Sequence, residues 1–341
     1  MFKKVLLSLA ILVFMIAPAS AKMKYWSSGK ITITAGTSST VKSDLGDFRV
    51  TGTDGTTLLS YWHEDITVPG TSPTWIKFSS VPTGTMQIGY VYYTNSDATS
   101  IANGNNVFIF FDDFSGTFTN WTVVNSNYAT ITSGELRYTG NDSDWYLRIY
   151  SNNAISRPNI IEWKSRNSQS SASADAEGYT TSDSANGYSQ GIMVVYGQGS
   201  GLEATMRLRL DGTEWTEIDS LDQIISRTQK LILPPSSGYK FYKDNVLYED
   251  DTAWTNPNNA NRISFSQYWS SKYSYVDDIR VRKYASSEPT LSLGAEESSS
   301  ALSGWSYRRP INCTNNSGEI LTDYQAILYL RTSSAGITII Q

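Results

Sequence analysis

Tryptophan side chains in polar surroundings are the residues of this sequence best suited to binding a ligand. The face of an indole ring can stack on the apolar C–H face of a pyranose, while neighbouring Asn or Asp side chains bind the hydroxyls. Trp145 lies beside Asp142 and Asp144, and Trp254 lies in a polar stretch over 251–261, so we expect both to be exposed. The alternative for each candidate is packing in a β-sheet core. The candidates are Trp121, Trp145, Trp215, Trp254 and Trp269.

An acidic string over 217–222 is the feature closest to a catalytic motif. In a strand, Glu217 and Asp219 point to one face because side chains alternate. A pair of carboxylates flanking a sugar linkage is the machinery of glycoside hydrolysis. Asp222 ends the string. The alternative is an acidic strand that simply faces solvent.

The composition favours a β protein and argues against several mechanisms. The 341 residues contain one Cys and one His, so an internal disulfide, a thiolate metal site and a multi-histidine zinc site are excluded. Charged residues make up 17% and aromatic residues 13%, which is typical of an exported all-β chain. The net charge is −5 with no basic block, so we expect no nucleic-acid partner.

The N-terminus has the pattern of a secretory signal peptide. Lys3 and Lys4 precede an apolar run over 5–16, and Ala19-Ser20-Ala21 forms a small-residue cleavage site. We therefore predict a signal peptide over 1–21 and a secreted or cell-surface protein; the alternative is an uncleaved anchor. No later apolar run is long enough to cross a bilayer, so we expect no transmembrane segment after cleavage.

The remaining chain divides into three blocks of strand-like segments. Turn signals and composition place the blocks at 22–104, 105–294 and 304–341, with a Glu/Ser-rich linker over 295–303. No convincing amphipathic helix is present, so the expected fold class is all-β.

Several strands can be placed within the middle block. The apolar run 107–111 predicts a strand buried on both faces, and further strands are expected at 160–163, 191–196, 204–210 and 230–233. Residues 238–248 predict a hairpin, because Asp244-Asn245 tolerates the positive φ of its turn. In the strand 275–284, alternation predicts one face with Asp277, Ile279 and Val281 and the other with Asp278, Arg280 and Arg282.

The first and third blocks resemble two halves of one known family. The strings 47–64, 75–78 and 90–95 are similar to the second half of the family called domain of unknown function 2341. The strings 304–311 and 323–330 are similar to its first half. The family recurs on exported bacterial and archaeal surface proteins and carries no established catalytic residues, so the resemblance implies a second, split β-sandwich without a catalytic site.

The middle block resembles the concanavalin A-like, laminin-G-like jelly roll. Phe111-Asp-Asp-Phe-Ser-Gly116 at its start and Tyr275-Val-Asp-Asp-Ile-Arg-Val281 at its end carry the resemblance. It implies that the first and last strands lie side by side and bring two acidic pairs together. Calcium takes six to eight oxygen ligands, and related jelly rolls often hold it near such positions. We therefore expect structural calcium on Asp112, Asp113, Asp277 and Asp278; the alternative is caps and turns.

The jelly-roll resemblance also bears on catalysis. Laminarinase-like glycoside hydrolases of this fold use Glu-x-Asp-x-x-Glu on one strand, and here the last position is Asp222. A retaining mechanism needs its carboxyl groups about 5–5.5 Å apart. The shorter side chain argues against catalysis, so we expect no enzyme, with a glycoside hydrolase using Glu217 and Asp222 as an alternative.

The inverted order of the two family halves leaves three arrangements open. The sequence is a fragment of a longer repeat array, or the two halves fold together within one chain around the jelly roll, or the C-terminal strands complete a neighbouring molecule. A half sandwich exposes unpaired strand edges and an apolar face, and this drives the last two arrangements. Self-association is therefore one expected partnership.

Three further residue types have structural interpretations that outweigh functional ones. His63 is expected to be an ordinary strand histidine, because no Ser/Asp string nearby suggests a triad. Cys313 is expected in a polar turn, with an intermolecular disulfide as the alternative. Arg308 and Arg309 are expected to pair with acids.

Together these features predict a secreted or cell-surface, non-catalytic binding or adhesion protein. The expected ligand is glycan or envelope polysaccharide, recognised through the jelly roll. A structural surface protein that assembles by strand exchange is the main alternative, and fold does not by itself decide between them.

Overall fold

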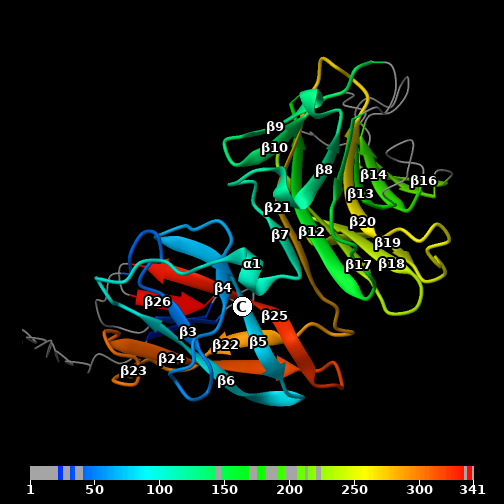
Figure 1. The fold of residues 1–341 in the computed structure, drawn as a ribbon. Helices are drawn as coiled ribbons and strands as arrows, with labels where there is room; N and C mark the ends of the chain where they lie inside the picture. Colours follow the sequence, from blue (N-terminus) through cyan, green and yellow to red (C-terminus); the bar gives the residue numbers. More distant parts are fainter. Residues whose placement is uncertain are drawn as a thin grey trace, which may run out of the picture.

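The computed structural model describes residues 22–25, 31–34, 41–142, 147–168, 175–181, 190–196, 206–211, 214–219, 224–333 and 336–339. Only the backbone is described for 22–25, 31–34, 209, 214–219, 333 and 336–339. The predicted all-β fold is confirmed, since strands form nearly all the regular structure, arranged as two sandwiches beside each other (Figure 1). No helix within these ranges is both long enough and apolar enough to cross a membrane.

The larger sandwich is the jelly roll, and its two sheets enclose the largest core. The first sheet has the order β19-β18-β17-β12-β21-β10-β9, and β7 also pairs with β21. The second has the order β16-β15-β14-β13-β20-β11-β8. Trp163, Phe265 and Ile279 are among the buried residues between them. The strands are β7 (Phe110–Asp112), β8 (Trp121–Val124), β9 (Ala129–Thr132), β10 (Glu135–Tyr138), β11 (Leu147–Ser151), β12 (Asn159–Asn167), β13 (Asp175–Thr180), β14 (Ile192–Tyr196), β15 (Met206–Leu210), β16 (Glu214–Asp219), β17 (Arg227–Leu233), β18 (Tyr239–Lys243), β19 (Val246–Asp251), β20 (Arg262–Gln267) and β21 (Ser274–Lys283).

Local turn chemistry forms the predicted hairpin. β18 and β19 pair antiparallel, and Asp244 and Asn245 both have positive φ, at 48° and 64°. A two-residue turn with both residues at positive φ has a backbone twist that matches the right-handed twist of the flanking strands. The hairpin brings Asn245 to one end of the first sheet, where it borders the site described below.

The sequence predicted a single strand over the apolar run 107–111, but the structure has two elements there. Residues Gly104–Val107 form the short helix α1, whose N-cap Asn103 accepts a hydrogen bond from the Asn105 N–H. β7 begins only at Phe110. The reason is packing: Val107, Phe108 and Phe111 pack with Trp75 outside the jelly-roll core. Phe110 therefore enters the jelly-roll core, Ile109 is 54% exposed instead of buried as predicted, and the other three residues of the run pack against the smaller sandwich.

The smaller sandwich is assembled from both ends of the chain. Its sheets have the orders β22-β24-β6-β3, with β23 also on β24, and β26-β25-β5-β4. Strand β24 pairs with β6 and β25 pairs with β5, so of the three arrangements left open the structure shows both halves paired within one chain. The strands are β3 (Arg49–Thr51), β4 (Tyr61–His63), β5 (Gly70–Val81), β6 (Gly84–Tyr93), β22 (Thr290–Leu293), β23 (Glu297–Ser298), β24 (Tyr307–Asn315), β25 (Leu321–Ser333) and β26 (Gly336–Ile339).

Two segments depart from the block boundaries drawn on the sequence. Strand β22, which we placed at the end of the jelly roll, pairs with β24, and its Leu291 enters the smaller core. Strand β23 lies within the expected linker and also pairs with β24.

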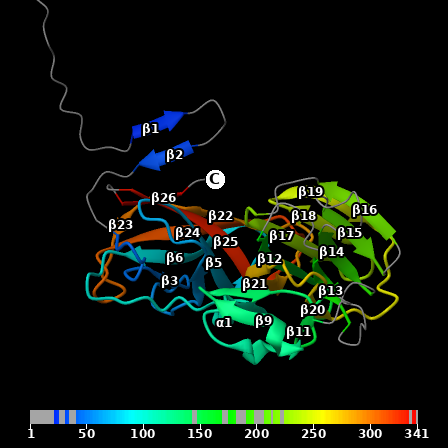
Figure 2. The same cartoon turned by 90° about the horizontal axis from the view of Figure 1, so that it is seen from above.

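A separate hairpin of β1 (Lys22–Tyr25) and β2 (Ile31–Thr34) lies beside β26 (Figure 2).

An aromatic cluster joins the two sandwiches. Trp75, Val107, Phe108 and Phe111 are buried together, and Trp62 stands edge-on to Phe111 with ring centroids 4.8 Å apart. Ring pairs of this geometry add about 0.5–1.5 kcal/mol beyond their buried area. The cluster packs β4 and β5 of the smaller sandwich against the start of the jelly roll.

Candidate functional site

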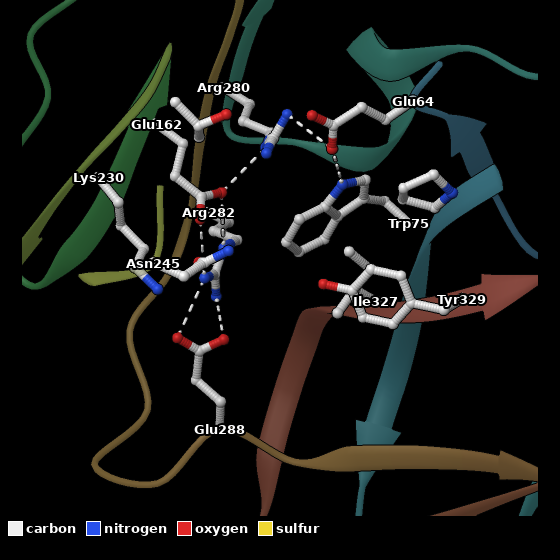
Figure 3. Close-up of a pocket in the computed structure, with 12 residues that line it drawn as sticks. Glu64, Trp75, Glu162, Lys230, Asn245, Arg280, Arg282, Glu288, Ile327 and Tyr329 are labelled. Carbon is white, nitrogen blue, oxygen red and sulfur yellow. Dashed lines mark hydrogen bonds and ion pairs between the residues drawn. The ribbon is translucent and has the colours of Figure 1, made fainter. Parts of the chain in front are cut away.

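A pocket of about 250 Å³ lies where the two sandwiches meet (Figure 3). The jelly roll contributes charged and polar side chains from β12, β17, β21 and the β18–β19 turn, while the smaller sandwich contributes aromatic and apolar side chains from β5 and β25. Residues that are far apart in the sequence therefore share one wall. The lining residues are Glu64, Pro73, Trp75, Glu162, Thr228, Lys230, Asn245, Arg280, Arg282, Glu288, Ile327 and Tyr329.

Two arginines of β21 form the base of the pocket. Ile279 and Val281 point into the jelly-roll core, so alternation turns Arg280 and Arg282 outward to the smaller sandwich. Glu162, the cross-strand partner of Arg280 on β12, accepts hydrogen bonds at Oε2 from Arg280 Nε at 2.9 Å and Arg282 Nε at 3.2 Å. Both guanidinium groups are almost fully buried, and the shared carboxylate offsets their charge.

Trp75 and Glu64 connect this base to the smaller sandwich. Arg280 Nη1 lies 3.1 Å from Glu64 Oε2, and Trp75 Nε1 donates to the same oxygen at 3.1 Å. The guanidinium carbons of Arg280 and Arg282 each lie 5.0 Å from the Trp75 ring centroid, a cation–π distance. Arg282 also lies 3.0 Å from Glu288 in the segment that leads out of the jelly roll.

Lys164 forms a second charged junction beside the pocket. Its ammonium lies 2.7 Å from Asp278 Oδ2 and 3.5 Å from Glu64 Oε1, and it also donates to Asp65. Burial alone would lower the pKa of Lys164, but these carboxylates raise it above its usual value. Glu64, Asp65 and Asp278 have the spacing of a metal-binding group, and here a lysine ammonium forms ion pairs with all three.

A β-bulge aims Asp278 at this junction and corrects one prediction. Val276 and Ile279 both enter the core although they are three residues apart, and the register with β12 shifts between Glu162 and Lys164. Asp278 has φ +48°, a left-handed conformation. Strict alternation predicted that Asp277 shares the face of Ile279. Because of the bulge, it does not. Bulges commonly redirect side chains in this way beside functional sites.

The four aspartates predicted to bind calcium have separate partners within the protein, and calcium binding by them stays a prediction. Their strands do adjoin, since Asp112 pairs with Ile279. The Asp112 carboxylate, however, accepts from Phe114 N–H, Asn120 Nδ2 and Trp121 Nε1. Asp113 accepts from Ser115, and Asp277 from Asp278 N–H. These acids fit a turn-and-cap role better than a shared ligand set, while the acidic cluster that exists involves only Asp278 of the four.

The predicted tryptophan platforms have different environments. Trp254 is 6% exposed rather than exposed as expected, because its Nε1 donates to Asp211 Oδ2 at 2.8 Å and Tyr239 packs edge-on against it. Trp121 is 4% exposed in the jelly-roll core. Trp145 and the Trp215 side chain lie outside the described residues. Trp269, at 39%, is exposed.

The remaining candidates are placed as follows. Glu217 lies on β16 opposite Arg207, and only its backbone is described. Asp222 lies outside the described residues. His63 is buried, its Nδ1 lies 2.8 Å from Thr74 Oγ1, and burial lowers its pKa to about 4. Cys313 is buried in the smaller core rather than in a polar turn. Arg308 pairs with Glu297 at 2.9 Å, as expected for this residue.

The charges around the pocket set the protonation states of two of its side chains. Burial by itself raises the pKa of Glu162, but Arg282 and Arg280 outweigh it and hold the pKa at about 2. Burial and the charges of Glu64 and Glu162 raise the pKa of Tyr329, which therefore keeps its phenolic proton. Sequence reasoning missed Glu162 as a site residue; its only local signal is a lone acid inside the apolar string 160–163.

The fold and the pocket define the class as a two-sandwich β protein with a jelly roll inserted in a split second domain. Residues 44–124 match the model of a family described as "Domain of unknown function (DUF2341)", which confirms the resemblance of the first block. Residues 304–341 lie outside that match, so their resemblance stays a prediction. No curated protein matches the chain.

Several solved structures are similar to about half of this chain. A β-glucanase from Bacillus licheniformis has 14% identity and a TM-score of 0.40 over 51% of this chain and 98% of its own. The Emp47p carbohydrate recognition domain has 15% identity and a TM-score of 0.40 over 51% and 94%. A β-1,3-glucanase from Mycobacterium marinum has 14% identity and a TM-score of 0.38 over 51% and 98%. All three have concanavalin A-like jelly-roll folds, and we infer neither ligand nor activity from them.

Proposed function

We propose that this protein is a secreted or cell-surface protein that binds glycan without cleaving it, in the pocket between the jelly roll and the split sandwich. One observation carries the proposal. The partly exposed ring of Tyr329 lines the pocket together with Thr228, Lys230 and Asn245, all of them on paired strands or a tight turn (Figure 3). The site thus combines an aromatic surface with fixed polar groups.

Such a surface matches the chemistry of a sugar ring. A pyranose presents an apolar C–H face and a rim of hydroxyls, so it needs an aromatic partner on one side and hydrogen-bonding groups around it. Tyr329 is 42% exposed, and Ile327 and Pro73 extend the apolar side. Sites of this kind join apolar walls to a few placed polar groups. The volume suits one sugar unit.

Binding is supported over cleavage by the state of the pocket carboxylates. Glycoside hydrolysis needs a carboxylic acid that can protonate the leaving oxygen. Glu162 has a pKa of about 2 and bonds two guanidinium groups, so it stays ionised at neutral pH. Glu64 accepts a hydrogen bond from Trp75 and forms ion pairs with Arg280 and Lys164. These acids hold cations in place.

The central experiment is affinity electrophoresis of residues 22–341 against a panel of neutral and acidic polysaccharides. We expect retardation on at least one member and a loss of about tenfold or more in affinity for Tyr329→Ala, since stacking of this kind contributes on the order of 1.4 kcal/mol. Tyr273→Ala is the matched control, because Tyr273 is similarly exposed but lies outside the pocket. Absence of retardation throughout would refute the proposal.

The other predicted platforms provide further arms. If Trp145→Ala or Trp269→Ala loses affinity while Tyr329→Ala binds normally, the sugar site lies on the jelly roll away from the pocket. Release of reducing ends that disappears in Glu217→Gln would establish the glycoside hydrolase instead. Retention of residues 1–21 on the exported product would refute signal cleavage.

A structural surface protein that assembles by strand exchange remains the rival function. Exchange would require β24 and β25 to leave β6 and β5, with which they pair along nearly their whole length. We therefore propose a monomer across concentration, checked by light scattering. Oligomers that grow with concentration and vanish when 304–341 is deleted would favour the rival.

A further inference from the structure

We infer that the sugar bound in this pocket is anionic, bearing a carboxylate or a sulfate, and that Lys230 receives its charge. This inference rests on the proposed glycan function and names the chemical class of the ligand. The charged groups of the pocket divide into those already engaged by the protein itself and those available to a ligand.

The three carboxylates of the pocket are all engaged by cations of the protein. Glu64 lies 3.1 Å from Arg280, Glu162 bonds Arg280 and Arg282, and Glu288 lies 3.0 Å from Arg282 (Figure 3). A ligand that needed Glu64 or Glu162 as an acceptor would compete with buried, charge-assisted contacts, which are the strong ones, while the more exposed Glu288 is already paired with Arg282. The acceptor capacity of the pocket is thus largely consumed.

Lys230 differs from the two arginines. It lies on β17 opposite Glu162, yet among the described residues no carboxylate oxygen lies within 4 Å of its ammonium. Its ammonium lies 4.5 Å from the centroid of the Tyr242 ring, a contact that positions the charge without neutralising it. Lys230 is therefore the pocket cation whose hydrogen bonds and charge are available to a ligand.

Neighbouring groups on the jelly-roll side can add donors to those of the Lys230 ammonium. Asn245 is held by the hairpin turn, and the preceding Asp244 is fixed by Arg227 Nη1 at 3.0 Å and by the Thr228 N–H at 3.0 Å. The Asn245 amide and the Thr228 hydroxyl can each donate to a ligand. The buried Arg282 Nη1 makes no hydrogen bond of regular geometry to any described residue, although Glu288 lies nearby.

The available side of the pocket is therefore cationic and rich in donors, and it lies across from the phenol of Tyr329. A sugar with a negatively charged substituent satisfies both sides: its ring meets Tyr329 and its anionic group meets Lys230, with Thr228 and Asn245 beside it. A sugar without a negative charge would forgo the ion pair with Lys230, so the pocket should bind it more weakly than an anionic one.

The test measures dissociation constants of the full mature chain for three soluble polysaccharides: polygalacturonate, dextran sulfate and neutral dextran. We expect at least one acidic polymer to bind about tenfold or more tightly than dextran, with affinity falling as NaCl is raised. Lys230→Gln should reduce acidic binding to the level of dextran. Lys240→Gln is the control, since it removes the same charge from an exposed, ion-paired lysine of β18 outside the pocket.

The outcomes separate the two claims. Preference for polygalacturonate assigns a carboxylate, and preference for dextran sulfate assigns a sulfate; either supports the inference if Lys230→Gln removes it. Equal binding of dextran and the acidic polymers overturns the inference but leaves the glycan function standing. An unchanged affinity in Lys230→Gln, with an unchanged melting temperature, overturns the role of Lys230. Binding to no polysaccharide of the wider panel refutes the glycan function itself.

Discussion

Arg280 of the jelly roll and Glu64 of the split sandwich lie 3.1 Å apart, both almost completely buried. The pair joins two domains that are built from different parts of the sequence. Around it, Glu162, Trp75 and Lys164 connect β12, β21, β5 and the segment after β4. The pocket owes its shape to this charged junction as much as to the aromatic cluster behind it.

The first prediction concerns that ion pair. Arg280→Ala should lower the free energy of unfolding by about 3–5 kcal/mol, because it leaves Glu64 and Glu162 buried with less compensating charge. Urea denaturation followed by tryptophan fluorescence checks this value. Arg308→Ala is the control, since the more exposed Arg308–Glu297 pair should contribute only about 0–1 kcal/mol. Equal effects of the two substitutions would contradict the proposed importance of the junction.

The second prediction concerns Lys164 and calcium. In the native protein the ammonium is ion-paired with Glu64, Asp65 and Asp278, so calcium or EDTA should leave the melting temperature unchanged. Lys164→Met should destabilise the fold at neutral pH through repulsion among the three acids, and calcium should restore part of the loss. Thermal unfolding with and without calcium measures both. A native protein stabilised by calcium and destabilised by EDTA would instead favour the site expected on Asp112, Asp113, Asp277 and Asp278.

The third prediction concerns a buried acid in the jelly-roll core. Burial and the charge of Asp175 raise the pKa of Glu177 well above its usual value, although Trp163 Nε1 donates to it at 2.8 Å. The folded state thus holds a proton that the unfolded state releases above its pKa of about 4.3. Stability is fully present below that pH and is lost as pH rises toward the folded pKa, by about 1.4 kcal/mol per pH unit.

Glu177→Gln should therefore flatten the dependence of stability on pH and raise stability at pH 8 relative to the native protein. Urea midpoints at pH 5 and pH 8 provide the comparison. Glu135→Gln is the control, because Glu135 is partly exposed and paired with Arg166. A native protein whose stability rises from pH 5 to pH 8 in a manner dependent on Glu177 would contradict the assigned direction.

The fourth prediction concerns the single cysteine. Cys313 is buried in the smaller core, and burial raises the pKa of its thiol to about 11. The thiolate is the reactive form, so the native protein should react with a thiol reagent at pH 8 far more slowly than the urea-unfolded chain. A rapid reaction of the native protein, or a disulfide-linked dimer, would favour the intermolecular disulfide considered from the sequence.

Much of the strand framework was predictable from local pattern. The expected segments 160–163, 191–196, 204–210 and 230–233 fall within or across β12, β14, β15 and β17. The 244–245 turn was predictable because its φ requirement is a property of two adjacent residues. The rule that side chains alternate between the two faces of a strand failed at Asp277-Asp278, since a bulge depends on the partner strand as well as on the bulged one.

The candidate site was largely outside the reach of such patterns. Trp254 stands in a polar stretch, yet its indole is buried because Asp211, from a distant turn, supplies a hydrogen-bond partner. Glu162 stands in an apolar string and becomes part of the pocket because two arginines of β21 pair with it. In both cases the deciding contact comes from a residue far away in the sequence.

By itself, the sequence determined the all-β class, the positions of most strands, the hairpin turn, and the outward direction of Arg280 and Arg282. These properties depend on side-chain alternation and turn conformation, which act over a few neighbouring residues. Only the tertiary structure decided that β24 and β25 complete the first block, that Lys164 bonds the three acids, and that Tyr329 comes to line the same pocket as Lys230. Those outcomes depend on which strand edges pair and which faces are buried against each other, and that choice is made by the whole chain.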